Sequence, residues 1–283
     1  TSPADVTPPF NIGSIFSAEQ VTIHMGSDVT YYKVIRDLLR DVPMGVTFDI
    51  GANQGFFTYY LATLGYDVHS FEINSNNFNA LQHGTLFNPV QVANRVHLYS
   101  MGISDKIGRF QQKGQNYGSF LKTYSRRGRL GTGSILSTTF DCFVQHVKLP
   151  LSHVPFVKID VEGFEISVLK GARHTLAANN VEVMLMEVGP ARWSRSGTSF
   201  PEGVEELRTW ARQFRYAFLS VRRPAVDGNV SHCHPDLALN LSDVAPRAVD
   251  TLRMHVVLEE EWKGLLLEMK KRKSDCNFLF TNV

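Results

Sequence analysis

Short apolar stretches alternate with helical patterns along the chain from Gly45 onward. Several stretches are rich in Val, Ile, Leu and Phe without polar alternation, which is typical of strands covered on both faces of a sheet. The predicted strands are Val46–Ile50, Asp67–Phe71, Val96–Ser100, Phe156–Asp160, Val181–Val188, Tyr216–Val221 and Asn277–Thr281. Because strands and helical segments alternate, the pattern predicts an α/β fold built on a parallel sheet.

Helical patterns occupy segments before and between these strands. Val29–Arg40 precedes the first strand, Phe56–Leu64 follows it, and Asn76–Phe87 follows the second. Near the end of the chain the pattern predicts an amphipathic helix, because apolar residues recur there at helical spacing. These residues are Trp262, Leu265, Leu266 and Met269.

The pattern divides the chain into an N-terminal segment with one helix, residues 1–44, and an α/β domain, residues 45–283. Two segments of the domain break the alternation. Residues 108–137 are rich in Gly, Ser, Arg and Gln, and residues 222–258 include a stretch rich in Pro, His and Asp. Both are longer than ordinary connections in a compact domain, so we expect insertions that carry binding segments.

The charge balance argues against one broad class of protein. The chain has 29 Lys and Arg against 27 Asp and Glu, a net charge of +2. A protein that grips nucleic acid needs a strong basic excess, so no nucleic acid partner is expected. No apolar run approaches the ~20 residues that cross a bilayer. The three cysteines are too few and too scattered for a disulfide framework.

The sequence leaves the compartment and the oligomeric state open. The chain begins at Thr1 rather than Met, which is compatible with removal of an upstream signal or anchor. Two glycosylation sequons, at Asn229 and Asn240, matter only in a secretory compartment. Both a cytoplasmic location and a secretory lumen therefore stay possible.

The sharpest motif lies where the first predicted strand meets its helix. It reads Val46-Thr-Phe-Asp-Ile-Gly-Ala-Asn-Gln-Gly55, so an acid at Asp49 is followed by two glycines that bracket a tight turn. Glycine suits a turn where the backbone bends sharply and a ligand approaches closely. Glu72 then ends the second predicted strand. In nucleotide-binding α/β folds an acid at that place accepts hydrogen bonds from ribose hydroxyls.

The spacing of the glycines selects among nucleotide ligands. A dinucleotide fingerprint reads G-x-G-x-x-G and a P-loop contains G-K-[ST], whereas this turn reads G-x-x-x-G directly after an acid. The carboxylate of Asp49 repels phosphate and suits a positively charged nucleoside without phosphate. S-adenosylmethionine (SAM) fits, because its amino and sulfonium groups are cationic and its ribose needs an acid such as Glu72.

Five motifs stand in the order seen in FkbM-family methyltransferases. They are Phe48-Asp-Ile-Gly-Ala-Asn-Gln-Gly55, Phe71-Glu72, Gly102-Ile-Ser-Asp105, Thr139-Phe-Asp141 and Val157-Lys-Ile-Asp-Val-Glu-Gly-Phe-Glu165. The chain resembles this family over about Asp28–Val188, and Lys-Ile-Asp-Val-Glu-Gly is the most specific part. The resemblance implies a Rossmann-like class I methyltransferase domain with a seven-stranded, mostly parallel sheet and helices on both faces.

The same resemblance implies chemistry and cofactor contacts. It implies SAM as methyl donor, S-adenosylhomocysteine as product, and oxygen acceptors on sugars or other hydroxyl-bearing small molecules or glycans. Asp49, Gly51, Asn53 and Gly55 resemble the loop that holds the methionine part of SAM, and Glu72 resembles the acid at the ribose.

Three further residues are expected at the cofactor on the same basis. Ser104 and Asp105 follow the third strand, where Asp105 resembles the residue that contacts the adenine amino group. Asp28 precedes the first strand and is a candidate for the methionine amino group. Asp105 could instead initiate a turn, and Asp28 could cap a helix after Ser27.

Three acids and a lysine gather near the carboxyl ends of the later strands, where ligands bind in α/β sheets. Lys158 and Asp160 share one face of a predicted strand, so the acid can pair with a lysine that is costly to bury alone. Glu162 begins the next turn, and Glu187 ends the following strand. We expect Asp160 and Glu187 to deprotonate or orient the acceptor hydroxyl, with Lys158 orienting them and Glu162 as a further candidate.

Several alternatives stay open. Asp160 and Glu187 could instead ligate Mg²⁺, but no asparagine follows Glu187 to complete the set, so we expect no metal. Lys158 could form a structural ion pair, and Glu162 could favour a first helical turn. The chain could also methylate RNA or protein, although the N-P-P-[FY] signature for planar amino groups is missing, or be an inactive SAM-binding regulator.

Overall fold

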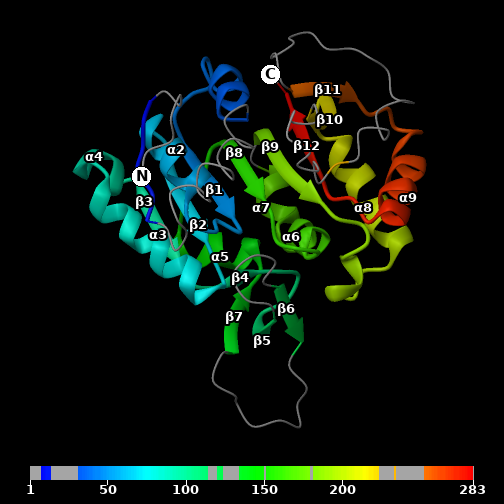
Figure 1. The fold of residues 1–283 in the computed structure, drawn as a ribbon, viewed down its shortest axis with the longest axis horizontal. Helices are drawn as coiled ribbons and strands as arrows, with labels where there is room; N and C mark the ends of the chain where they lie inside the picture. Colours follow the sequence, from blue (N-terminus) through cyan, green and yellow to red (C-terminus); the bar gives the residue numbers. More distant parts are fainter. Residues whose placement is uncertain are drawn as a thin grey trace, which may run out of the picture.

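The computed structural model describes residues 8–13, 31–113, 120–123, 134–149, 151–178, 181–222, 233 and 252–282. At its centre lies an eight-stranded sheet with the strand order β11-β10-β12-β9-β8-β1-β2-β3 (Figure 1). The strands are β1 (Val46–Ile50), β2 (Asp67–Phe71), β3 (Val96–Tyr99), β8 (Val154–Ile159), β9 (Val181–Val188), β10 (Tyr216–Arg222), β11 (Leu252–Val256) and β12 (Cys276–Thr281).

Most neighbours in this sheet run parallel. β1 pairs in parallel with β2 and β8, β2 with β3, and β8 with β9. β12 is inserted antiparallel between β9 and β10, and β11 pairs antiparallel with β10 at the edge. The α/β class and the mostly parallel sheet are as predicted.

The expected count of seven strands is wrong by one, because β11 adds an eighth. This strand lies within residues 222–258, for which the sequence predicts an insertion. Its sequence, Leu-Arg-Met-His-Val, mixes polar and apolar positions. Such mixing is ordinary for an edge strand, which is only half covered and therefore lacks the apolar run of a central strand.

Helices cover both faces of the sheet. Along β9, Met184 and Met186 pack into one apolar cluster, whereas Val183 and Leu185 pack into a second, as the alternation of a strand requires. The first cluster includes residues of α5 (Phe140–Val147), α6 (Glu165–Gly171), α7 (Arg173–Ala178), α8 (Phe200–Ala211) and α9 (Trp262–Arg272). The second includes residues of the helical segment 31–38, α2 (Phe56–Thr63) and α3 (Ser75–Phe87), which is followed by α4 (Val90–Ala93).

The predicted helices are confirmed where the structure describes them. Residues 31–38 are helical within the predicted Val29–Arg40 segment, and α2 and α3 each lie within one residue of the predicted bounds. Helix α9 buries the four apolar residues whose spacing predicts it. Among the residues described, no helix combines the length and apolar character needed to cross a membrane.

The segment 108–137 contributes most of a second sheet. This sheet has the order β4-β7-β5-β6, from β4 (Gly102–Ile103), β5 (Gly108–Lys113), β6 (Phe120–Thr123) and β7 (Ser134–Thr138). It projects below the main sheet in Figure 1. Phe110 of β5 packs with Phe164, which follows β8, and Ile73, which follows β2, borders the same small cluster. The second sheet therefore stands at the carboxyl ends of the parallel strands.

Two cysteines form a disulfide bond, which corrects the expectation from their number and spacing. Cys233, from the segment 222–258, pairs with Cys276 at the start of β12, with a Cα–Cα distance of 4.6 Å. Both residues are buried. The pairing depends on where β12 lies in the sheet, so cysteine spacing alone could not indicate it.

Candidate active site

The parallel register brings the ends of β1, β2 and β8 together. The backbone N–H groups of Gly51 and Ala52 donate to the carbonyl oxygen of Phe71, each at 2.9 Å, and the N–H of Asp160 donates to the carbonyl of Ile50. The glycine turn thus lies directly between Glu72 and Asp160. Sequence-predicted residues from three strands meet at this one edge.

Asp49 and Lys158 are neighbours in the β1–β8 register and lie inside the protein. The Lys158 ammonium lies 3.5 Å from Asp49 Oδ1 and 3.4 Å from Asp160 Oδ2, and it donates to the Gly51 carbonyl at 2.9 Å. Thr58 of α2 donates to the other oxygen of Asp49 at 2.7 Å. The expected pairing of Lys158 with Asp160 is confirmed, and the lysine also ties the turn to the end of β8.

The turn between β1 and α2 adopts left-handed backbone angles at three residues. φ is +86° at Gly51, +51° at Asn53 and +92° at Gly55. A Cβ atom at Gly51 would overlap the carbonyl oxygen of Asp160, and one at Gly55 would overlap Leu81. The two glycines are therefore required by both backbone conformation and packing within the protein, in addition to any close approach by a ligand.

Glu72 lies at the end of β2 with its carboxylate almost wholly buried. Its two oxygens accept from the backbone N–H groups of Asn53 and Asn74, each at 2.7 Å. Burial raises the pKa of Glu72 to about 7, and backbone hydrogen bonds from Asn74, Asn53 and Ile73 and the charge of Lys158 oppose this rise. A carboxylate has about four lone-pair sites, so Glu72 can hold the turn and still accept a hydrogen bond from a hydroxyl group.

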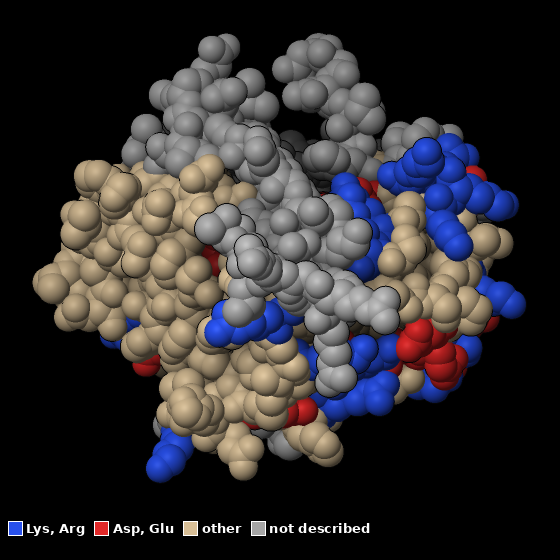
Figure 2. Space-filling model, turned by 90° about the horizontal axis from the view of Figure 1, so that it is seen from below, with Lys and Arg blue, Asp and Glu red and all other residues tan. Residues whose placement is uncertain are grey.

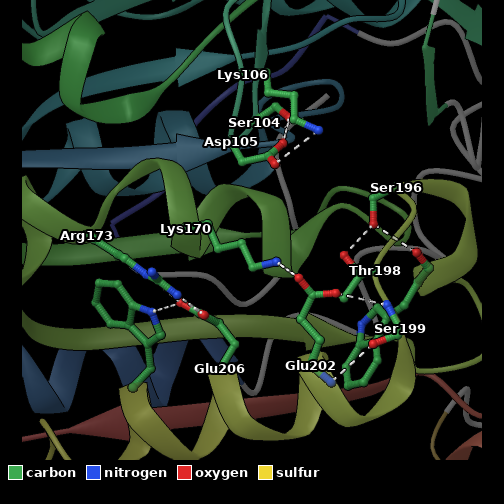
Figure 3. Close-up of polar contacts among 12 residues, drawn as sticks. Ser104, Asp105, Lys106, Lys170, Arg173, Ser196, Thr198, Ser199, Glu202 and Glu206 are labelled. Atoms are coloured by element: carbon green, nitrogen blue, oxygen red, sulfur yellow. Dashed lines mark hydrogen bonds and ion pairs between the residues drawn. The ribbon is translucent and has the colours of Figure 1, made fainter.

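Ser104 and Asp105 follow β4 and lie beside the end of α6. The Ser104 hydroxyl donates to Asp105 Oδ1 at 3.0 Å, and Lys106 lies 3.6 Å from Asp105 Oδ2 (Figure 3). Gly171 lets this segment approach, because a Cβ there would overlap the Ser104 carbonyl. Among the described residues, neither Ser104 nor Asp105 forms a hydrogen bond or ion pair with Glu72. Asp28 lies outside the described residues.

Asp160, Glu162 and Glu187 form a carboxylate cluster next to the turn. One oxygen from each lies within 4.8 Å of the others. Glu162 lies in the loop between β8 and α6 with φ +55°, so it is not part of a first helical turn. Burial, together with the charges of Asp160, Asp275 and Glu162, raises the pKa of Glu187 well above its ordinary value, whereas Arg192 lowers it.

Arg192 and Asp275 complete the cluster, and sequence reasoning missed both. The Arg192 guanidinium is hydrogen-bonded to Glu162, is ion-paired with Asp275 and lies 3.9 Å from Glu187 Oε2. In the β9–β12 register, Glu187 lies opposite Asn277, close to Asp275. An arginine five positions after Glu187 was a usable signal, but Asp275 comes near only because β12 is inserted beside β9.

The donor set could suit a hard cation, since three carboxylates face one another. However, the guanidinium of Arg192 already supplies the opposing positive charge, and Arg195 adds a second, 3.4 Å from Glu162 Oε2. A metal ion would have to displace hydrogen-bonded Arg192 from Glu162. The cluster therefore fits an arginine counter-charge better than Mg²⁺.

Figure 2 views the molecule from the end that carries the second sheet. Lys and Arg gather there in patches with acidic side chains beside some of them, rather than over one continuous surface. This distribution agrees with the near balance of 29 basic and 27 acidic residues.

Comparisons with solved structures find methyltransferases. A SAM-dependent methyltransferase from Agrobacterium tumefaciens matches with 9% identity and a TM-score of 0.42, over 90% of this chain and 62% of that protein, so this chain spans less than two thirds of its length. A precorrin-6y C5,15-methyltransferase from Geobacter metallireducens matches with 10% identity and a TM-score of 0.38, over 96% and 94% of the two chains. The glycopeptide N-methyltransferase MtfA, complexed with SAM, matches with 10% identity and a TM-score of 0.34, over 88% and 85%.

A search among curated proteins finds no match. The model of the methyltransferase FkbM domain matches residues 49–218, which is more than half of the chain. The match begins at Asp49 and includes the turn, Glu72, Asp160 and Glu187. The chain belongs to the FkbM methyltransferase family.

Proposed function

We propose that this enzyme transfers the methyl group of SAM to a hydroxyl group of a sugar, a glycan or a glycosylated natural product. The observation that carries the proposal is the carboxylate cluster of Asp160, Glu162 and Glu187, which lies beside the glycine turn at the carboxyl edge of the sheet. Lys158 contacts both Asp49 of the motif and Asp160 of the cluster, which supports adjacent donor and acceptor positions.

In this proposal the turn and Glu72 hold the donor. The ionised Glu72 accepts a hydrogen bond from the ribose, while its contacts to Asn53 and Asn74 keep the carboxylate in place. Asp49, which is buried against Lys158 and Thr58, holds the turn that surrounds the methionine part. Ser104 and Asp105 contact the adenine end. SAM supplies an electrophilic methyl group on a positively charged sulfur.

The cluster supports chemistry on an alcohol. A sugar hydroxyl is a weak nucleophile, and a base that accepts its proton contributes about 10²–10⁴-fold in rate. Glu187 suits this role because burial and the neighbouring acids raise its pKa, which makes its carboxylate a stronger base. As the proton moves to Glu187, the C–O bond forms and the C–S bond breaks, which leaves the methyl ether and S-adenosylhomocysteine. Asp160 orients the hydroxyl, and Lys158 holds Asp160.

The surroundings of the cluster support a polar acceptor. Glu187 and Glu162 have side chains that are 21% and 24% exposed, so both are partly accessible from outside. The second sheet stands at the same edge and packs over the loop after β8, where it can limit which molecules reach the cluster. A polyol offers several hydrogen-bond donors and acceptors to such a surface. An apolar acceptor would instead leave the charged groups of the cluster without hydrogen-bond partners.

We also infer that the enzyme works in an oxidising compartment. The buried Cys233–Cys276 disulfide supports this inference, because such bonds rarely persist where thiols are kept reduced. A secretory lumen would also suit a glycan acceptor. Recovery of the disulfide from enzyme isolated under thiol-trapping conditions would agree with the inference, and recovery of both thiols in free form would contradict it.

The acceptor is best identified with isotopically labelled SAM. The enzyme is incubated with a panel of glycans, glycosylated metabolites, RNA and protein, and the labelled methyl is located by mass spectrometry and NMR. The proposal expects label in an O-methyl ether of a sugar. Label in RNA or protein, or label on nitrogen only, would contradict it, as would failure of every hydroxyl acceptor class.

A further inference from the structure

Arg192 occupies an unusual place for an arginine, since it lies among three acids from different parts of the chain. Its guanidinium contacts Glu162 from the loop after β8, Asp275 from the residue before β12, and Glu187 from β9. Its side chain is 27% exposed, so the group lies at the boundary between the protein interior and the acceptor side. The proposed chemistry uses Glu187 but leaves the arginine without a role.

We propose that Arg192 is a positioning residue for the transfer reaction, because its guanidinium group holds Glu162 and Asp275 in place and leaves Glu187 free to receive the proton of the acceptor. This proposal rests on the proposed function, in which Glu187 is the base. Arg192 itself touches neither donor nor acceptor in this scheme.

The unequal contacts of the guanidinium support this division. Arg192 is hydrogen-bonded to Glu162 and tightly paired with Asp275, whereas its nearest nitrogen lies 3.9 Å from Glu187 Oε2. That last distance is beyond a hydrogen bond. Glu187 therefore receives the electrostatic benefit of the cation while its oxygens remain available for a hydroxyl group. Arg195 strengthens the hold on Glu162 by donating to its carbonyl oxygen at 3.0 Å.

The chain makes room for this arrangement at two glycines. At Gly163, which has φ +99°, a Cβ would lie 2.9 Å from the Cβ of Arg192. At Gly189 a Cβ would overlap Asp275 Oδ1 and lie 3.6 Å from Arg192 Cδ. A larger residue at either position would push the arginine or its acid partner out of place.

The segment that carries Arg192 is also anchored. Trp193 is 1% exposed and packs on Gly203 of α8, where a Cβ would overlap its ring. The 3₁₀ turn η1 (Trp193–Arg195) continues into Ser196, whose hydroxyl donates to the Trp193 carbonyl at 2.8 Å and lies 3.0 Å from Thr198 Oγ1 (Figure 3). A buried, hydrogen-bonded segment of this kind is rigid, which suits a residue that holds others in position.

The segment after Arg192 is also tied to two helices. Ser199 caps α8 in a reciprocal capping box with Glu202. Glu202 in turn pairs with Lys170 of α6 (Figure 3). Because α6 follows the loop that carries Glu162, both ends of the Arg192–Glu162 contact are tied to the same pair of helices.

The charges around Glu187 predict opposite shifts of the pH profile when a positive or a negative neighbour is removed. Asp160 from the end of β8, Glu162, and Asp275 beside β12 raise its pKa together with burial, and Arg192 lowers it. Transfer requires the ionised base, so kcat/KM rises as pH rises through the pKa of the coupled carboxylates. This rise is the acidic limb of the pH profile of kcat/KM. Loss of Arg192 should move the limb to higher pH, and loss of the Asp275 charge should move it to lower pH.

The experiment compares Arg192→Gln, Arg192→Lys and Asp275→Asn with the control Arg212→Gln, which removes an exposed arginine paired with Glu259. We expect Arg192→Gln to lower kcat about a hundredfold, as small misplacements of reacting groups do, with an unchanged dissociation constant for S-adenosylhomocysteine. Arg192→Lys should keep the limb near its wild-type pH because it keeps the charge, while kcat falls because the forked contacts are lost. Arg212→Gln should match wild type.

The opposite movements distinguish positioning from a general loss of folding, which would not depend on the sign of the removed charge. The proposal is overturned if the limb stays in place in Arg192→Gln, if both charge variants move it in the same direction, or if donor binding falls as much as kcat. If Arg192→Gln does not fold, Arg192→Lys and Asp275→Asn still give the test. The acidic limb of Arg192→Lys must stay near its wild-type pH, and that of Asp275→Asn must lie at lower pH.

A readout without turnover separates this proposal from the proposed function. In protein with ¹³C-labelled glutamate carboxyl groups, the Glu187 signal, assigned with Glu187→Gln, is titrated by NMR. Arg192→Gln should raise the pKa of Glu187 and Asp275→Asn should lower it, even if no hydroxyl acceptor is ever methylated. Failure of the glycan panel with these shifts intact would refute the proposed function alone, whereas unchanged Glu187 titration would refute the role of Arg192.

Discussion

Glu72→Gln should weaken the binding of S-adenosylhomocysteine about a hundredfold at about pH 8. The carboxylate accepts two backbone N–H groups at 2.7 Å each. A glutamine side chain offers one acceptor oxygen, and its NH₂ group faces the second N–H. The ribose loses a charge-assisted hydrogen bond worth about 1.5–3 kcal/mol, and about 3 kcal/mol corresponds to about a hundredfold in affinity.

The same substitution should remove a pH dependence. Burial raises the pKa of Glu72 to about 7, so the fraction of wild-type protein with an ionised, ligand-competent Glu72 rises between about pH 6 and pH 8. Affinity should rise with it, and Glu72→Gln should be flat over this range. Because the folded-state pKa is raised, the group favours folding below its ordinary pKa, and this contribution is lost as pH rises through about 7.

Isothermal titration calorimetry at the two pH values measures both effects. The matched control is Glu260→Gln, which changes an exposed glutamate and should bind as the wild type does. Thermal unfolding confirms that Glu72→Gln is folded, with a loss of about 1–3 kcal/mol for the unpaired N–H. Wild-type affinity in Glu72→Gln at about pH 8 would refute the idea that this carboxylate holds the ribose.

Four further outcomes are expected. Gly51→Ala should lower the free energy of unfolding in urea by about 1–3 kcal/mol from backbone strain alone, because φ is +86° and its Cβ would also overlap Asp160; an unchanged midpoint would contradict this. Glu187→Gln should lower the single-turnover rate by about 10²-fold or more and spare donor binding, and unchanged turnover would remove it as base. EDTA should leave kcat unchanged, since Arg192 supplies the counter-charge; inhibition reversed by Mg²⁺ would refute that assignment. Reduction of Cys233–Cys276, 43 residues apart, should cost about 4 kcal/mol of stability in denaturant unfolding, and equal stability of the oxidised and reduced proteins would contradict this.

Much of the fold could be predicted because the central strands are buried on both faces. Asp67–Phe71 and Val181–Val188 have the predicted bounds, because most of their residues are buried within the covered sheet. The second sheet could not be predicted in the same way. Its strands come from a polar, glycine-rich segment, and they form through pairing with one another and through the contact of Phe110 with Phe164.

Part of the candidate site could also be predicted from the sequence, and part could not. Asp49, Glu72 and Asp160 could be placed together because each ends a parallel strand, and parallel strands share one carboxyl edge. Asp275 could not, because its approach depends on β12 being inserted antiparallel beside β9. The disulfide depends on the same insertion. Local patterns therefore predicted the acids at the ends of the parallel strands, whereas Asp275 could be placed only from the order of the strands in the sheet.

We propose that the donor bound at the glycine turn presents its methyl group to the carboxylate cluster. A crystal structure of the enzyme with S-adenosylhomocysteine tests this arrangement most directly. We predict ribose hydroxyls on Glu72 and a sulfur atom that faces Glu187, with room between them for one hydroxyl group about 3 Å from the position of the transferred carbon. A product molecule bound elsewhere, or one whose sulfur points away from the cluster, would show that this arrangement is wrong.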